Sequence, residues 1–111
     1  MKKGEVWRAR LPPAVGHAQA GERPAVIVEN EPFLSALPTV LLVPFTGQIA
    51  ASRFPGTVVV QPDGQNGLSV PSVALVFQLT AQDKQILLYR MGELAPDVLD
   101  QIVAIIQAMT S

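Results

Sequence analysis

Short apolar runs separated by proline, glycine and polar residues make up most of this chain. Runs of about 4–8 residues rich in Val, Ile and Leu are typical of β-strands. Residues 24–29 and 39–45 are apolar at nearly every position, which predicts strands buried on both faces. Pro44 would remove a ladder hydrogen bond, so we expect it at an edge or a bulge. Six strands are expected, at residues 5–11, 24–29, 39–45, 57–61, 72–79 and 86–90.

The hydrophobic pattern changes to a helical period near the C-terminus. Apolar residues recur there with i, i+3 and i+4 spacing at Val98, Leu99, Ile102, Val103, Ile105, Ile106 and Met109. Pro96 suits the first position of a helix, and Asp97 suits the positive end of the helix dipole. The stripe must pack on a sheet or on another subunit. Short strands followed by one helix predict a mainly β fold, a strongly bent antiparallel sheet or barrel with a C-terminal helix.

The composition fits one folded domain over residues 1–111, because domains most often have about 100–150 residues. Hydrophobic residues make up 49% and charged residues 15% of the chain, which excludes a disordered chain and suggests a self-association surface. The chain has no cysteine and one histidine. A disulfide framework, a zinc–thiolate site, a cysteine nucleophile and a multi-histidine metal site are therefore excluded, and no cofactor is expected.

The charges are divided unevenly along the chain. The net charge is −1, whereas nucleic-acid binders are usually basic. Residues 1–55 carry six basic and four acidic side chains, and residues 56–111 carry two and five. We therefore expect a polyanion to meet the N-terminal half. The first residues lack the apolar core of a signal peptide, and no run approaches the ~18 apolar residues of a membrane span, so a soluble cytoplasmic protein with no membrane partner is expected.

Two polar residues at strand ends could carry chemistry. Arg23 precedes Pro24 and is therefore pushed to an extended conformation at the start of a strand. Thr46 ends the next strand, where its hydroxyl could donate to a phosphate oxygen. Simpler explanations exist for both residues. Arg23 could be a surface arginine beside a carboxylate such as Glu22, and Thr46 could be a turn threonine bonded to its own backbone.

The loops at residues 12–22 and 47–56 hold further candidates. His17 could transfer a proton, because the unperturbed pKa of histidine, about 6.5, lies near neutrality. A lone histidine in a loop is usually only solvated. Arg53 could grip a phosphate while the neighbouring Phe54 stacks a base, unless Phe54 is a core anchor. Polar residues flanking the fifth strand could read base edges or only close a solvated hairpin end: Gln78, Asp83 and Lys84.

The order of these motifs resembles the MazF/PemK family of toxin–antitoxin ribonucleases along nearly the whole chain. The specific part is a G-x-x-Q-x-G-x-R-P block at residues 16–24 followed by P-x-T at residues 44–46. Further similar pieces are K-G-E-V-W (3–7), G-L-S-V-P-S-V-A-L-V-F-Q-L (67–79), D-K (83–84) and M-G-E-L (91–94). The resemblance implies a small SH3-like antiparallel barrel of the CcdB/PemK kind.

The resemblance also implies a function. It indicates the toxin of a type II toxin–antitoxin system, an mRNA interferase that cleaves single-stranded RNA sequence-specifically without a metal. It further implies a homodimer, a MazE-like antitoxin as partner, and cleavage that leaves a 2′,3′-cyclic phosphate and a 5′-hydroxyl. Arg23 and Thr46 match the family's catalytic pair, and His17 matches a histidine implicated in PemK-like members. The residues expected to contact RNA are Gln19, Gln48, Arg53, Phe54, Gln78 and Lys84.

The chain also departs from the PemK-like pattern. Leu75 and Phe77 stand where those members have an arginine and an aspartate, and Ala18 stands where a glutamate is common. Two other functions stay open. One is a CcdB-like non-enzymatic inhibitor of DNA gyrase on the same fold, although the tail Q-A-M-T-S lacks the tryptophan expected of that branch. The other is a β-barrel binding module without activity.

Overall fold

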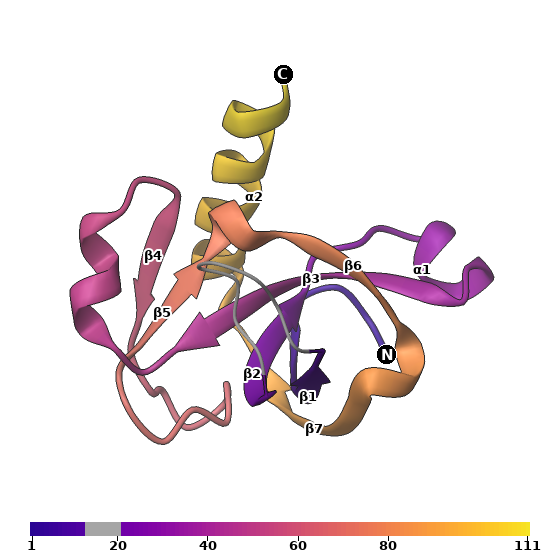
Figure 1. Ribbon diagram of the computed structural model, residues 1–111, viewed down its shortest axis with the longest axis horizontal. Coiled ribbons are helices and arrows are strands. Elements are labelled where there is room, and N and C mark those ends of the chain that lie inside the picture. The colour runs from indigo at the N-terminus through magenta and orange to yellow at the C-terminus, as the bar shows by residue number, and fades with distance from the viewer. Residues whose placement is uncertain (13–20) are drawn as a thin grey trace.

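The computed structural model describes residues 1–12 and 21–111. The strands are β1 (Glu5–Leu11), β2 (Gly21–Ile27), β3 (Thr39–Thr46), β4 (Thr57–Val60), β5 (Ser72–Leu75), β6 (Thr80–Asp83) and β7 (Leu87–Glu93). The helices are α1 (Phe33–Ala36) and α2 (Pro96–Thr110), with short 3₁₀ helices η1 (Ile49–Arg53), η2 (Val76–Gln78) and η3 (Lys84–Ile86). The prediction of a mainly β fold with a C-terminal helix is confirmed (Figure 1).

The strands form one bent sheet in the order β4-β5-β3-β2-β1-β7, with β6 also paired to β3. The pairings among the described strands are antiparallel. The long strand β3 joins two parts of the sheet, because its first half pairs with β6 and its last two residues pair with β5 (Figure 1). The strand path is open, with β4 and β7 at its ends, so the sheet curls into a barrel-like shape without closing into a ring.

Pro44 lies inside the sheet and not at an edge. On one side of β3, Pro44 is opposite Ala25 of β2. On the other side, the pairing jumps from Leu42 to Phe45 as β3 changes partner. The Val28 amide donates to the Leu41 carbonyl, so the backbone groups of Leu41 point toward β2. Backbone groups alternate in direction along a strand, so the nitrogen of Pro44 points away from β2 and into that gap. The missing N–H is therefore placed where no ladder bond is formed.

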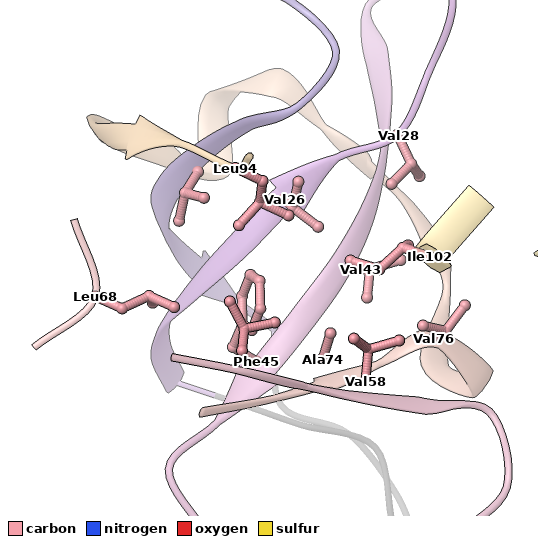
Figure 2. Close-up of a cluster of buried hydrophobic side chains, with 12 residues drawn as sticks. Val26, Val28, Val43, Phe45, Val58, Leu68, Ala74, Val76, Leu94 and Ile102 are labelled. Carbon is pink, nitrogen blue, oxygen red and sulfur yellow. The ribbon is translucent and has the colours of Figure 1, made fainter. Parts of the chain in front are cut away.

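Both faces of β2 and β3 are covered, as their continuous apolar runs predict. Val26, Val43 and Phe45 belong to the larger of two buried clusters, which Ile102 of α2 also joins (Figure 2). The alternate residues Ile27 and Leu42 belong to a second cluster on the other face. Successive side chains of a strand point to opposite faces, so each run supplies both clusters. This double burial holds the ends of β2 and β3 in fixed positions.

One predicted strand ends earlier than expected, and two short elements were not predicted. The strand expected at residues 72–79 ends at Leu75, because the chain turns into η2 and the Phe77 amide donates to the Gly56 carbonyl at 3.2 Å. The polar run of β6 showed no strand pattern, and its ladder bonds come from β3. The four-residue α1 has no helical repeat, and it is held by burial of Leu34.

The C-terminal helix has the expected start and the expected packing face. Pro96 lies in its first turn together with Asp97. Ile102 is fully buried against the sheet, and the partly buried Val98, Leu99, Ile105 and Ile106 pack around the same cluster. Among the helices in residues 1–12 and 21–111, none has both the length and the apolar character to span a membrane.

Candidate active site

A cavity of about 250 Å³ opens where the start of β2 meets the end of β3. Its lining residues are Arg8, Glu22, Arg23, Pro24, Phe45, Thr46, Gly47, Leu68, Ser69, Val70, Ser72 and Met91. Arg23 and Thr46, the two residues singled out at strand ends, both line this one cavity. The fold therefore brings Arg23 and Thr46, from two separate segments, to one cavity.

The register of the sheet explains why these two residues meet. Strands β2 and β3 pair with Ala25 opposite Pro44 and Val26 opposite Val43. Continuing that register by two residues sets Arg23 opposite Thr46, and residues directly opposite in an antiparallel pair share one face. Arg23 is itself held in β2 by pairing with Ala9 of β1. The position of Arg23 is thus fixed by backbone pairing and not by a loop.

Thr46 is almost fully buried, with 5% of its surface exposed. Its Oγ1 accepts a hydrogen bond from the Gln48 amide at 3.2 Å, so the turn-forming explanation of this threonine describes a contact that exists. A hydroxyl that accepts one bond keeps its own proton for donation. The turn bond therefore orients the Thr46 side chain without using the hydrogen that a phosphate oxygen would accept.

The cavity contains a second arginine that the sequence analysis did not select. Arg8 lies opposite Pro24 in the ladder between β1 and β2, one position from the pair formed by Ala9 and Arg23. Its Nε is 3.7 Å from a carboxylate oxygen of Glu22, whose other oxygen is 3.2 Å from Nη2 of Arg10. The alternation of β1 was visible in the sequence. The pairing of β1 with β2, which sets Arg8 opposite Pro24 at the cavity, was not.

A second cavity, of about 160 Å³, adjoins the first through Thr46. It is lined by Thr46, Gln48, Ala51, Phe54, Leu75, Phe77 and Gln78. The rings of Phe54 and Phe77 are tilted by 59°, with their centroids 5.9 Å apart, and the Arg53 guanidinium lies 5.1 Å from the centroid of Phe54. Phe54 is 42% exposed and is therefore not a core anchor.

Close backbone contacts fix one wall of the larger cavity. A Cβ on Gly67 would lie 2.3 Å from the carbonyl oxygen of Met91, and a Cβ on Gly92 would lie 2.1 Å from that of Gln65. The segment before Leu68 is thereby pressed against β7, where the Glu93 amide also donates to Gln65 at 2.9 Å. Gly67 has φ +75°, a conformation that other residues rarely adopt. These contacts hold the cavity wall in place.

The remaining predicted site residues are distributed unevenly. Gln48, Phe54 and Gln78 line the second cavity, and Arg53 stacks on its edge. Lys84 lines neither cavity. Its ammonium donates to the Leu34 carbonyl at the opposite end of β3, because Thr39 pairs with Asp83 there. His17 and Gln19 lie outside the described residues. Among the described residues, no group of three or more His, Cys, Asp or Glu side chains could hold a metal ion.

Comparison with known proteins gives one consistent result. The sequence model of the PemK-like, MazF-like toxins of type II toxin–antitoxin systems matches residues 2–110. Endoribonuclease EndoA of Bacillus subtilis (strain 168) is 30% identical over 102 residues, covering 92% of this chain and 87% of that protein.

Solved structures show the same fold. The structure of MazF from Deinococcus radiodurans superposes with a TM-score of 0.81 at 22% identity, over 98% of this chain and 94% of that one. A mycobacterial endoribonuclease in complex with its cognate antitoxin gives a TM-score of 0.74 at 21% identity, over 97% and 92% of the two chains. The fold is thus that of the MazF toxins. The chain belongs to the family of PemK-like, MazF-like toxins of type II toxin–antitoxin systems.

Proposed function

We propose that residues 1–111 form one toxin domain that acts as a metal-independent, sequence-specific endoribonuclease on single-stranded RNA, an mRNA interferase. Family membership and the relative named as an endoribonuclease support this function. The structural observation that carries it is the shared cavity of Arg23 and Thr46. A guanidinium and an alcohol side by side suit a phosphodiester, because the guanidinium matches phosphate oxygens in a bidentate manner.

The chemistry needs little beyond these groups, because RNA carries its own nucleophile. The 2′-oxygen loses its proton to a base and bonds to the adjacent phosphorus, while the bond from phosphorus to the 5′-oxygen breaks and the leaving oxygen takes up a proton. The products are a 2′,3′-cyclic phosphate and a 5′-hydroxyl. In-line positioning and stabilisation of the doubly charged phosphorane are the protein's main contributions.

Arg23 is assigned the stabilisation of the phosphorane charge, since arginine stays protonated and makes a poor base. Thr46 is assigned a hydrogen bond to a non-bridging oxygen of the scissile phosphate, because the turn bond from Gln48 presents its hydroxyl to both cavities. His17 remains the predicted group for proton transfer. Arg23 and Thr46 thus stabilise charge and position the phosphate, and His17 transfers the proton.

The second cavity is assigned to the base next to the cut. Gln48 and Gln78 can read base edges, and the exposed ring of Phe54, with Arg53 over it, can stack on a base. Gln19 stays a prediction in the first loop. A role for Lys84 would require the RNA to follow the whole of β3. The base-reading groups therefore gather around Thr46, beside the scissile phosphate.

The partners follow from the same proposal. Structures of related toxins include one with its cognate antitoxin, which supports a MazE-like antitoxin here. A homodimer is supported by the apolar composition and by half-exposed apolar side chains, among them Ile49, Val59 and Val70. We place the protein in the cytoplasm, where its RNA substrates are.

The test is incubation of the purified protein with unstructured single-stranded RNA in EDTA, followed by analysis of the ends. Cleavage in EDTA with cyclic phosphate and 5′-hydroxyl ends is expected. The same sequence as DNA, or with a 2′-methoxy group at the cut site, should stay intact because the nucleophile is missing. Loss of all cleavage on chelation would contradict the metal-free mechanism. A gyrase cleavage assay in parallel tests the CcdB-like alternative, for which we expect no effect.

A further inference from the structure

Arg8 is a second cationic side chain in the larger cavity, and its bonding within the described residues is incomplete. It lines the same space as Arg23 and Thr46, with about a third of its side chain exposed. Its one ion pair there is the 3.7 Å contact to Glu22, which is longer than a hydrogen bond. A guanidinium has five N–H donors. The donors of Arg8 are therefore available to a ligand that enters the cavity.

Glu22 contacts both Arg8 and Arg10, and its contact with Arg10 is the shorter one. Its contact to Arg10 is a hydrogen bond of 3.2 Å, whereas its contact to Arg8 is not. The formal charge of Arg8, Arg10, Arg23 and Glu22 together is +2. Pairs between half-exposed groups contribute little to stability, because water screens them. Little is therefore lost when Arg8 leaves Glu22 for a stronger acceptor.

We propose that Arg8 binds a second phosphate of the RNA, next to the one held by Arg23 and Thr46, and that Glu22 holds the Arg8 side chain toward the cavity until the RNA arrives. The proposal rests on the proposed function, since it takes single-stranded RNA as the ligand. The cavity supports it, because Arg8 of β1 and Arg23 of β2 both line it together with Thr46. On binding, the phosphate replaces a long contact with a bidentate one, and Glu22 keeps Arg10.

The experiment measures the salt dependence of binding to a short 2′-methoxy oligonucleotide of mixed sequence, which cannot be cleaved. For a single strand, each neutralised phosphate contributes about 0.7 to the slope of log K against log salt. Arg8→Gln should reduce that slope by about one such contact and weaken binding several-fold at low salt. Glu22→Gln should strengthen binding, because it removes the competing carboxylate. Arg8→Lys should keep the slope and lose part of the affinity, because lysine keeps the charge without the fork.

Arg10→Gln is the matched control. It makes the same charge change and also loses contact with Glu22, but Arg10 does not line the cavity. Its slope should stay near that of the unchanged protein. An equal fall in slope for Arg8→Gln and Arg10→Gln would overturn the proposal. The effect would then come from the loss of positive charge on the protein and not from a contact in the cavity. Thermal unfolding of each variant shows whether the fold is retained, and Arg8→Lys gives a second test if Arg8→Gln fails to fold.

Two further arms separate this proposal from the function on which it rests. Cleavage of unmodified RNA by the unchanged protein tests the ribonuclease itself. If RNA is cleaved and Arg8→Gln leaves the slope unchanged, the Arg8 subsite is wrong and the ribonuclease stands. If RNA is not cleaved, the ribonuclease is wrong whatever Arg8 does. An acidic peptide titrated in parallel tests a protein ligand, and dependence on Arg8 for the peptide alone would overturn the RNA subsite.

Discussion

Two clusters of charged side chains lie on β1 and its neighbours, and they are bonded in opposite ways. At one end of β1, Glu5 is buried with 6% of its surface exposed. Its carboxylate accepts hydrogen bonds from the Lys2 amide at 2.9 Å, from the Trp7 indole at 3.1 Å and from Arg90 Nε at 2.9 Å. At the other end, Glu22 is about half exposed and, within the described part of the chain, makes one hydrogen bond and one long contact.

The difference separates a structural ion pair from a binding site. Burial pushes the pKa of Glu5 up, but the bonds from Trp7, Lys2 and Arg90 and the charge of the N-terminus outweigh it and hold that pKa below its usual range. A buried carboxylate bonded in this way connects β1 to Arg90 of β7 and serves the fold. At the Glu22 end, Arg8 keeps spare donors and lines a cavity. Changes there should alter activity, and changes at Glu5 should alter stability.

The largest effect is expected for Arg23→Ala. Loss of one group that stabilises transition-state charge typically lowers rates by roughly 10²–10³-fold, and the phosphorane is doubly charged, so cleavage should fall at least that far. The melting temperature should stay nearly unchanged. Initial rates of cleavage of a labelled RNA and thermal unfolding measure the two quantities. Arg10→Ala, at an exposed arginine of the neighbouring strand that does not line the cavity, is the control. A normal rate for Arg23→Ala would remove Arg23 from the mechanism.

Thr46→Val is expected to lower the cleavage rate by about 10–100-fold. Valine keeps the shape of the buried side chain but loses the hydroxyl, and a hydrogen bond to a charged group contributes about 1.5–3 kcal/mol. Thr46→Ser keeps the hydroxyl and should retain most of the rate. Single-turnover rates at saturating enzyme separate this loss from weaker binding. If serine and valine were equally poor, packing at Thr46 and not its hydroxyl would be what matters.

Glu5→Gln should lower stability and leave activity unchanged. It should lower the free energy of unfolding by about 1–3 kcal/mol, since the amide cannot replace the charged acceptor of Arg90, and leave the rate per folded molecule unchanged. Because the folded-state pKa of Glu5 is depressed, its stabilising contribution is full above the unfolded value of about 4.5 and is lost as the pH falls through the lower folded value. Urea unfolding at neutral pH and well below pH 4.5 checks both statements. A constant difference between the two proteins at every pH would contradict them.

The smallest effect is expected for Arg53→Ala. The guanidinium stacks on Phe54 at an exposed position, where a cation–π contact contributes about 0.5–1 kcal/mol. The free energy of unfolding should therefore fall by no more than about 1 kcal/mol. RNA binding should weaken by about two- to fivefold, because water screens a contact between a phosphate and an exposed arginine. Fluorescence anisotropy with the 2′-methoxy oligonucleotide measures the affinity. A loss of RNA affinity as large as that from Arg23→Ala would show that Arg53 binds the RNA directly and strongly.

Much of the fold could be predicted from the sequence, because the signals were local. The apolar runs of β2 and β3 required burial on both faces, and Pro96 and Asp97 marked the start of α2. The elements that were missed depend on distant partners. Strand β6 is a short polar run that gains its ladder bonds from β3, and η2 replaces the end of an apolar strand because its backbone bonds Gly56.

The candidate site was also only partly predictable from the sequence. The sequence indicated Arg23 and Thr46 by their places at strand ends and by motif, and the fold brings both to one cavity. Phe77 was noted only as a departure from a pattern, whereas in the structure it forms a wall of the second cavity with Phe54. Lys84 looked equivalent to Gln78 in the sequence. The two separate in space because β6 carries Lys84 back along β3.

The sequence by itself determined which residue types were available and which segments became strands or a helix, because propensity, turn residues and hydrophobic period act over a few neighbouring positions. Only the tertiary structure decided that Arg8, Arg23 and Thr46 line one cavity, and that the carboxylate of Glu5 is bonded to Lys2, Trp7 and Arg90. Those relations depend on strand register, and a shift of one residue would turn every side chain of a strand to the other face.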